Sequence, residues 1–274
     1  MNKHIEDIEF TIFDTETTGL DPGSGDRIVE IAAIRFRGKE KSATFQRLVN
    51  PHREISEAAY NVNHITPEML KDAPEMSVIM PEFLDFIKGT CLCSYNAGFD
   101  VEFLNNELTL LGQKHLEDIM IVDILKMARR LLPGLERYAL WFVADRLGLR
   151  IQQTHRAFAD VEMTLGVFYR LKDIMFAKGI LDFTSFTHLF TINLKLLENI
   201  NAQKLSQIQE AIGLRVKLKI RYLPTSGGEL SEREVIPREI RQENNRSYLV
   251  GYCCLRNEER IFRVDSILHL EIVV

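Results

Sequence analysis

The chain has 274 residues, a formal net charge of −5, 46% hydrophobic and 27% charged residues. This composition is typical of a globular protein, and the length allows two domains with a sizeable core. No apolar run approaches the roughly 20 residues of a membrane span, and the polar residues 1–7 contain no signal-peptide core. We therefore expect a cytoplasmic protein that makes no contact with a membrane.

The first part of the chain predicts a mixed α/β sheet. Strands at 8–14, 27–37 and 42–49 alternate in hydrophobicity and indicate an antiparallel meander. Helices and strands then alternate, which adds a parallel part to the sheet. We expect a short helix that begins with Thr66 as N-cap and Pro67, strands at 90–95 and 118–122, and helices at 78–88, 96–111, 123–131, 138–147 and 157–177.

The last part of the chain predicts a small β-barrel. Residues 178–200 are apolar and contain no clear turn signal, so they join the two parts as helix or strand. A short amphipathic helix at 202–212 follows. Strands with turn-like separators are expected at 214–223, 231–241, 246–254, 259–264 and 266–273. The four cysteines (91, 93, 253 and 254) lack the spacing of a zinc knuckle, and we expect buried free thiols.

Four carboxylates and one histidine follow the expected strands and helices. Asp14 and Glu16 end the first strand, Asp100 starts the helix after the fourth strand, and His155 and Asp160 precede or begin the last helix. In an open α/β sheet, ligands gather beyond the carboxyl ends of the strands. Carboxylates in one place raise one another's pKa, and divalent cations remove that conflict. Oxygen ligands of this kind suit Mg²⁺ or Mn²⁺.

Each of these signals also has a plainer interpretation. Paired carboxylates such as Asp14 and Glu16 are common on surfaces, Asp100 can complement a helix dipole, and a single histidine is more often solvated than catalytic. Only their joint occurrence predicts a two-metal phosphodiesterase. The net charge of −5 argues weakly against tight nonspecific binding to nucleic acid.

The three stretches around these residues resemble the exonuclease motifs of the DEDDh family of 3′–5′ exonucleases, which includes the proofreading epsilon subunit of bacterial replicative polymerase, ribonuclease T and oligoribonuclease. The likeness covers residues 8–177 and includes 62–69, 122–130 and 138–149. A histidine five residues before the last aspartate marks the histidine subclass. Tyr95 and Asn63 depart from the common pattern. The resemblance implies a ribonuclease H-like fold.

It also implies a role for each site residue. Asp14 would bridge two divalent cations, Mg²⁺ or Mn²⁺. Glu16 and Asp160 would complete the cation that holds the attacking water, and Asp100 would help to hold the second. His155 would act as the general base. Gly19 would let the chain turn sharply and let a nucleotide approach the backbone. The expected contacts to the terminal nucleotide are Thr15, Thr17, Gly19, Leu20, Asn96 and Phe99.

Residues 202–274 resemble a WYL domain, an Sm-like small barrel. The likeness rests on 216–222, 234–237, 246–249 and 260–265, although Ser247 and Ser266 depart from the pattern. Such a domain implies a nucleic-acid or nucleotide ligand. The candidate residues are Arg221, Tyr222, Arg246, Tyr248, Arg260 and Arg263. The alternative is a solvated face on which these arginines pair with Glu232, Glu234 and Glu239.

Together these features predict a DEDDh exonuclease domain at 1–178, a linking segment at 179–201 and a WYL domain at 202–274. The expected activity is metal-dependent release of nucleoside monophosphates from single-stranded DNA 3′ ends, regulated through the WYL domain. An RNA 3′ exonuclease is the alternative, followed by a regulatory nucleic-acid-binding protein dominated by its WYL domain. A DNA polymerase or a repair protein is a further expected partner.

Overall fold

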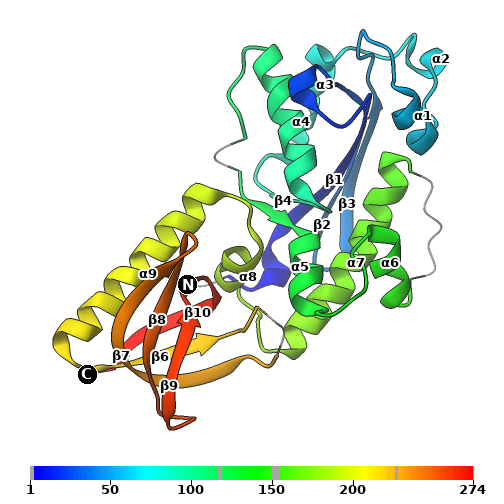
Figure 1. The fold of residues 1–274 in the computed structure, drawn as a ribbon. Coiled ribbons are helices and arrows are strands. Elements are labelled where there is room, and N and C mark those ends of the chain that lie inside the picture. Colours follow the sequence, from blue (N-terminus) through cyan, green and yellow to red (C-terminus); the bar gives the residue numbers. More distant parts are fainter. Residues whose placement is uncertain (1–2, 117–118, 150–154, 226–227, 274) are drawn as a thin grey trace.

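Two five-stranded sheets make up the framework of the computed structural model, which describes residues 3–116, 119–149, 155–225 and 228–273 (Figure 1). The strands of the first sheet are β1 (Glu9–Thr17), β2 (Ile28–Arg37), β3 (Glu40–Leu48), β4 (Cys91–Ser94) and β5 (Ile121–Asp123). They lie in the order β3-β2-β1-β4-β5. The first three form the expected antiparallel meander, and β4 and β5 add the parallel part. The mixed sheet is thereby confirmed.

Helices cover both faces of the first sheet. They are α1 (Glu57–Asn63), α2 (Pro67–Leu70), α3 (Met76–Ile87), α4 (Ala97–Leu110), α5 (Ile124–Leu131), α6 (Leu140–Arg146), α7 (Ala157–Ala177) and α8 (Phe183–Phe190). The core on one face joins α3 and α4, and the core on the other joins α5, α6, α7 and α8. Thr66 caps α2 and Pro67 begins it, as expected. Helix α1, which Ser56 caps, was not predicted because its seven residues show no clear apolar period.

Strand β1 decides which residues face which helices. It runs through Asp14 to Thr17, further than the expected end at residue 14. Phe10 and Ile12 point into the core beside α7, whereas Phe13 points into the core beside α4. Side chains alternate along a strand. Asp14 and Glu16 therefore face the α7 side, and Thr15 faces the α4 side.

The segment between the two sheets is helical. Phe186 and Phe190 of α8 are fully buried in the core of the first sheet. The next helix, α9 (Leu194–Leu214), starts eight residues earlier than the expected helix at 202–212 and packs Ile208 and Ala211 against the second sheet. Local sequence patterns did not predict its first turns, because residues 194–201 mix apolar and polar side chains without a strong apolar stripe.

All five strands expected in the second part are present. They are β6 (Lys217–Tyr222), β7 (Ser231–Glu243), β8 (Arg246–Cys253), β9 (Glu258–Arg263) and β10 (Ile267–Val273), antiparallel in the order β10-β6-β7-β8-β9. Strands β7 and β8 separate β6 from β9 in the sheet, yet the rings of Tyr222 on β6 and Phe262 on β9 lie 5.2 Å apart. The sheet is therefore strongly curved. No ladder joins β9 to β10 among the described residues, so a closed barrel is not confirmed.

The two sheets are joined by buried contacts. Leu223 and Leu268 of the second part belong to the core that covers the α7 side of the first sheet. Arg130 of α5 donates hydrogen bonds to the carbonyl oxygen of Leu223 (2.7 Å) and to Ser266 Oγ (3.1 Å). All four cysteines are free, and only Cys254 is partly exposed. Within the described ranges no helix is both long and apolar enough to cross a membrane.

Candidate active site

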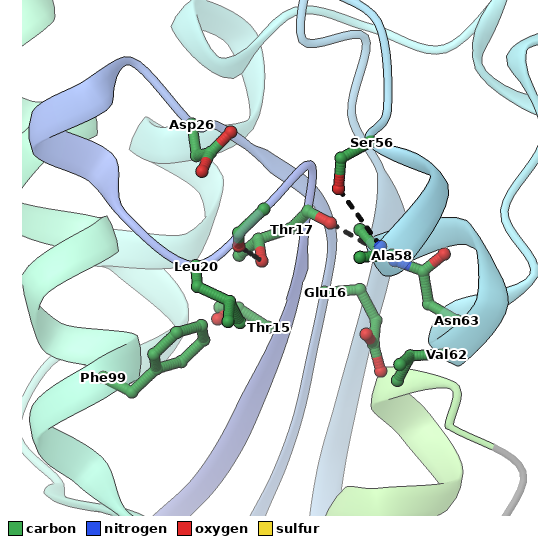
Figure 2. A pocket seen from close by; sticks show the side chains of 12 residues that line it. Thr15, Glu16, Thr17, Leu20, Asp26, Ser56, Ala58, Val62, Asn63 and Phe99 are labelled. Carbon is green, nitrogen blue, oxygen red and sulfur yellow. Dashed lines mark hydrogen bonds between the residues drawn. The ribbon is translucent and has the colours of Figure 1, made fainter.

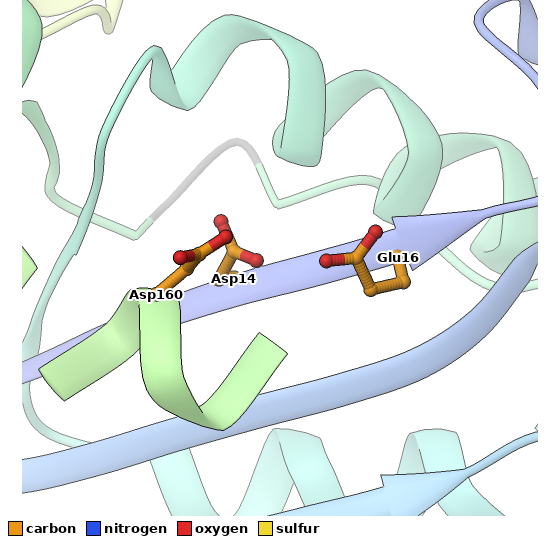
Figure 3. A group of neighbouring side chains, drawn as sticks. All are labelled: Asp14, Glu16 and Asp160. Carbon is orange, nitrogen blue, oxygen red and sulfur yellow. The ribbon is translucent and has the colours of Figure 1, made fainter. Parts of the chain in front are cut away.

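Three carboxylates from two elements meet at the centre of the first sheet. Asp14 and Glu16 lie on β1, and Asp160 lies in the first turn of α7, which packs across β1 and β2 (Figure 3). One carboxylate oxygen from each of the three residues lies within 4.8 Å of the other two. Asp160 is only 7% exposed. The α7 side of β1 therefore carries a compact acidic group.

Burial and mutual repulsion disfavour the charged forms of these groups. Burial raises the pKa of Asp14 well above its usual range, and repulsion from Asp100, Glu16 and Asp160 adds to the rise. Burial also raises the pKa of Glu16 to about 8, with further contributions from Asp160 and Glu30. A cation among the oxygens would reverse both effects. An all-carboxylate donor set fits a hard divalent cation.

Asp100 lies outside this group because it faces β1 from the other helix layer. Its Oδ1 accepts hydrogen bonds from Thr15 N (3.0 Å) and Thr15 Oγ1 (2.7 Å), and its Oδ2 accepts one from Ser94 Oγ (2.6 Å). Burial raises the pKa of Asp100 to about 6, although these hydrogen bonds oppose the rise. Asp100 thus contacts the backbone between the two carboxylates of β1. Ser94 was missed by sequence reasoning, although it ends the strand before the helix of Asp100.

His155 is exposed and directly precedes the N-cap residue of α7. Its backbone is left-handed, with φ 48°. The next residue, Arg156, is held by Glu30 of β2, which is fully buried: Arg156 Nε donates to Glu30 Oε2 and Nη2 to Oε1, both at 2.9 Å. Glu30 Oε2 also accepts a hydrogen bond from Ala157 N at 3.2 Å. Glu30 therefore anchors the turn that carries His155, a role that no local pattern indicated.

A pocket of about 510 Å³ adjoins the acidic group on the α1 side (Figure 2). Glu16 belongs to both. Leu20, 84% exposed, and Phe99 of α4 form one wall, and Val62 and Asn63 of α1 form another. Five of the six expected nucleotide contacts line the pocket: Thr15, Thr17, Gly19, Leu20 and Phe99. Asn96 is not among the lining residues and instead precedes α4 with a left-handed backbone.

Gly19 has a different role from the one expected. It is not among the glycines with positive φ, so it does not supply a left-handed turn. A Cβ atom at Gly19 would lie 2.2 Å from Asp26 Oδ2. Asp26 in turn accepts hydrogen bonds from Thr18 Oγ1 (3.0 Å) and Asp21 N (3.1 Å). Gly19 is therefore needed to make room for a carboxylate that orders the loop beside the pocket.

Comparisons with known proteins agree with this geometry. The family model described as Exonuclease matches residues 11–168. The DNA polymerase III subunit epsilon of Treponema pallidum is 43% identical over 165 residues, which are 60% of this chain and 76% of that protein. The chain belongs to the exonuclease family. It is a 3′–5′ exonuclease, a hydrolase of phosphodiester bonds.

Other comparisons match the C-terminal part of this exonuclease or larger shares of its chain. The WYL domain model matches residues 203–272. DNA polymerase III PolC-type of Staphylococcus aureus is 31% identical over 93% of this chain, but the match spans only 18% of that protein. Exonuclease X in complex with 5′-overhanging duplex DNA is 28% identical over 62% of this chain, with a TM-score of 0.50. An E. coli ExoI–ssDNA complex covers 90% of this chain at 18% identity with a TM-score of 0.58, and it shows a shared fold.

The candidate ligand residues of the WYL domain are largely engaged within the protein. Arg221 donates to the carbonyl oxygen of Gly179 at 3.0 Å, Arg260 pairs with Glu258 at 3.0 Å, and Arg263 pairs with Asp265. Tyr222 packs edge-on against Phe262. Tyr248 stands opposite Arg263 in the ladder of β8 and β9, and Arg246 is exposed at the start of β8.

The glutamates expected beside those arginines pair with other cations. Glu232 pairs with Lys219 (3.4 Å) and Glu234 with Lys217 (3.1 Å). Glu239 pairs with Arg241 at 2.7 Å. Lys217, Lys219 and Arg241 of the second sheet are therefore each paired with a glutamate, which offsets part of the positive charge of this sheet.

Proposed function

We propose that this exonuclease releases nucleoside monophosphates from the 3′ ends of single-stranded DNA by hydrolysis assisted by two divalent cations, Mg²⁺ or Mn²⁺. The observation that carries the proposal is the convergence of Asp14, Glu16 and Asp160 within 4.8 Å, beside a pocket of about 510 Å³. The pocket is large enough for the terminal nucleoside, and Glu16 belongs both to its lining and to the carboxylate group. Cleavage would then occur one nucleotide from the end.

The carboxylates would hold the cations. Asp14, Glu16 and Asp160 would hold one ion together, and Asp14 would also hold a second. Two bound cations would supply stabilisation of the attacking and leaving oxygens in an in-line displacement. Asp100, held by Ser94 and Thr15, would act at the second ion and would keep β1 aligned with α4.

The other side chains would place the substrate and move the proton. Leu20 and Phe99 would pack against the last base, and the backbone of the Thr15–Leu20 segment would contact its sugar and phosphate. His155 would accept the proton of the attacking water. Histidine is the side chain best suited to accept a proton from water near neutral pH. The ion pair of Arg156 with Glu30 would hold His155 in position.

RNA is the second candidate substrate. The 3′-exonuclease that recognises a histone mRNA stem-loop has the same fold over 62% of this chain, with a TM-score of 0.54 and 19% identity. The lining of the pocket offers the hydroxyl group of Ser56, which accepts from Ala59 N and is able to donate to a sugar hydroxyl, whereas the hydroxyl groups of Thr15 and Thr17 already donate to Asp100 and to the carbonyl oxygen of Gly19. DNA remains the preferred substrate because the 43% identical relative is a DNA polymerase subunit.

For the second part, we propose a WYL domain with an Sm-like barrel at 202–274, joined by residues 179–201 to an exonuclease domain at 1–178. A nucleic-acid or nucleotide ligand would bind near Arg246, Tyr248 and Arg263, and would displace partners such as Asp265. We also propose association with a DNA polymerase, on the basis of the epsilon and PolC-type relatives.

The decisive experiment incubates purified full-length protein with end-labelled linear single-stranded DNA, circular single-stranded DNA, duplex DNA or RNA. The label is at the 3′ or the 5′ end, and each substrate is tested with Mg²⁺, with Mn²⁺ and with chelator. Stepwise shortening of 5′-labelled single-stranded DNA with release of mononucleotides, abolished by chelator, supports the proposal. Preferential degradation of RNA selects the second candidate. Internal cutting of circular single-stranded DNA contradicts an exonuclease, since a circle has no 3′ end.

A His155→Ala variant tests the base. The expected result is loss of most of kcat with metal affinity unchanged, because His155 is not part of the carboxylate group. A His155→Gln variant separates proton transfer from hydrogen bonding. A pH profile of kcat that is the same in wild type and variant excludes His155 as the base.

A further inference from the structure

The outer face of α6 exposes aromatic rings beside arginines. Trp141 is 46% exposed, and Phe142 is half-buried without joining any of the described core clusters. On the inner face of the same helix, Val143 and Ala144 are buried against α7. We call the outer group, Arg137, Trp141, Phe142 and Arg146, the α6 patch. Burial of the helix does not account for its aromatic side chains.

The rings and guanidinium groups of the α6 patch contact one another. Arg137 Cζ lies 6.0 Å from the Trp141 ring and 5.7 Å from the Phe142 ring, and Arg146 Cζ lies 5.0 Å from the Phe142 ring. The two rings meet edge-on at 5.6 Å. Glu136 pairs with Arg137 at 3.1 Å, but both side chains are more than half exposed, so water screens this pair. Phosphate groups can therefore compete for Arg137.

Hydrogen bonds and helix packing connect the α6 patch to the elements that carry the active site. Tyr95 Oη donates a 2.7 Å hydrogen bond to the carbonyl oxygen of Tyr138, just before α6. Tyr95 follows Ser94, which holds Asp100. The helix itself packs on α7, which carries Asp160. α6 belongs to the same helix layer as α7, and in Figure 1 it lies to the right of α7, whereas the second sheet lies at the lower left and does not cover it.

We propose that the α6 patch binds the single strand upstream of the 3′ end, with a base stacked on Trp141 and backbone phosphates on Arg137 and Arg146. This rests on the proposed function, because it assumes that a 3′ end occupies the catalytic pocket. Exposed rings give a stacking surface for any base, and arginines beside them supply the charge that a phosphate chain requires. The patch is small, with two arginines, and fits a strand of a few nucleotides better than a duplex.

The chain offers a direct signal for this contact because Trp141 is its only tryptophan. Full-length protein is titrated in chelator, without cleavage, with oligothymidylates of two and of twelve nucleotides while tryptophan fluorescence is recorded. The twelve-mer is expected to quench the emission, with an affinity that weakens as salt rises. The dinucleotide, which fills only the catalytic pocket, is expected to leave the emission unchanged.

Variants separate binding at α6 from catalysis. Trp141→Ala and Arg137→Gln are expected to raise KM for the twelve-mer about tenfold, in the range of losing one stacked base, and Trp141→Phe is expected to retain much of the affinity. Hydrolysis of the p-nitrophenyl ester of thymidine 5′-monophosphate, which is too small to reach α6, stays unchanged. The control is Arg47→Gln, an arginine 5.0 Å over Phe45 that pairs with Glu82 of α3, on the opposite face of the first sheet.

The outcomes distinguish the two levels of the proposal. The role of the α6 patch is overturned if the ester is hydrolysed but the twelve-mer does not quench the fluorescence, or if Trp141→Ala leaves KM for the twelve-mer unchanged. The exposed rings would then be a binding surface for a protein partner. Absence of both ester and oligonucleotide hydrolysis with metal overturns the proposed function instead. Equal effects of Arg47→Gln and Arg137→Gln also contradict the proposal, because they would reflect general charge.

Discussion

Glu30 and Arg156 form a bidentate ion pair that ties β2 to the start of α7, across 126 residues of sequence. Glu30 stands opposite Glu16 in the β1–β2 ladder, so both side chains face α7. The same layer of the protein therefore holds one carboxylate that we propose as a metal ligand, Glu16, and one that holds the turn of His155, Glu30. Arg156 neutralises the second of these charges.

Glu30→Gln is expected to destabilise the protein and slow catalysis. The carboxamide keeps the size but leaves the Arg156 guanidinium with a weaker partner, at a cost of about 1–3 kcal/mol. kcat should fall more than KM rises, because His155 and Asp160 lose a fixed position. Urea unfolding and steady-state kinetics measure both. The control is Glu9→Gln, which weakens the more exposed pair with Arg35 (2.7 Å) and should leave kcat unchanged.

The same variant should show a particular dependence on pH. Burial raises the pKa of Glu30, but hydrogen bonds from Arg156 and Gln46 outweigh it and lower the pKa below its usual 4.5. The pair therefore stabilises the fold above about pH 4.5, and this contribution is lost as pH falls through the lowered value. The difference in unfolding free energy between wild type and Glu30→Gln should be largest near pH 7 and shrink below pH 4. A difference that is constant with pH would contradict this account.

Asp14→Asn is expected to abolish cleavage while raising thermal stability in chelator. Burial and the neighbouring carboxylates raise the pKa of Asp14, which means that its charge is unfavourable without a cation. The amide removes this cost. Wild type should gain stability on addition of Mn²⁺, and the variant should gain much less. Thermal unfolding with and without Mn²⁺ measures this, with Asp173→Asn on the exposed side of α7 as the control. Cleavage at the wild-type rate by the Asp14→Asn variant would exclude Asp14 as a catalytic metal ligand.

Gly19→Ala is expected to weaken substrate binding. The added Cβ would meet Asp26 Oδ2 at 2.2 Å, so Asp26 has to leave its hydrogen bonds with the loop. KM for single-stranded DNA should rise at least several-fold, with a smaller change in kcat. Gly98→Ala is the matched control, since nothing lies within 4 Å of a Cβ at that position of α4. Equal kinetics for the two variants would show that the Asp26 loop does not shape the pocket.

Lys204→Met is expected to remove a pH-dependent part of the stability of the domain contact. Lys204 is 8% exposed, lies 2.9 Å from His188 Nε2 and donates to the carbonyl oxygen of Ile267. Burial lowers its pKa from 10.5 to about 7, and Asp265 only partly opposes this. Burial, with repulsion from Lys204, also lowers the pKa of His188 to about 3, so His188 stays neutral above pH 5.

The sign of this effect follows from proton binding. Between about pH 7 and 10.5 the unfolded chain binds a proton at Lys204 that the folded protein has released, so wild-type stability should rise with pH in that window. Lys204→Met should lack the rise, whereas Lys219→Met, at an exposed lysine of the second sheet, should keep it. Unfolding free energies at pH 7 and 9.5 provide the measurement. Parallel curves for wild type and Lys204→Met would exclude a buried, titrating Lys204.

Local sequence patterns determined most of the helices and strands of this protein, apart from α1, α8 and the first turns of α9, and much of the acidic group. The alternation of β1 puts Asp14 and Glu16 on one face, and the N-terminal turn of α7 carries Asp160. Both are properties of short segments with a fixed geometric period, so they can be inferred without knowing the fold. The order of strands and helices likewise follows from period and turn signals.

Only the tertiary structure decided which helix each face of β1 meets. Because α7 covers one face and α4 the other, Asp160 joins Asp14 and Glu16 while Asp100 reaches Thr15 and Ser94 instead. The anchor of Arg156, the wall that α1 adds to the pocket and the room that Gly19 leaves for Asp26 have the same origin. Each is a contact between segments that only the packing of helices on the sheet brings together, and local propensity carries no information on that packing.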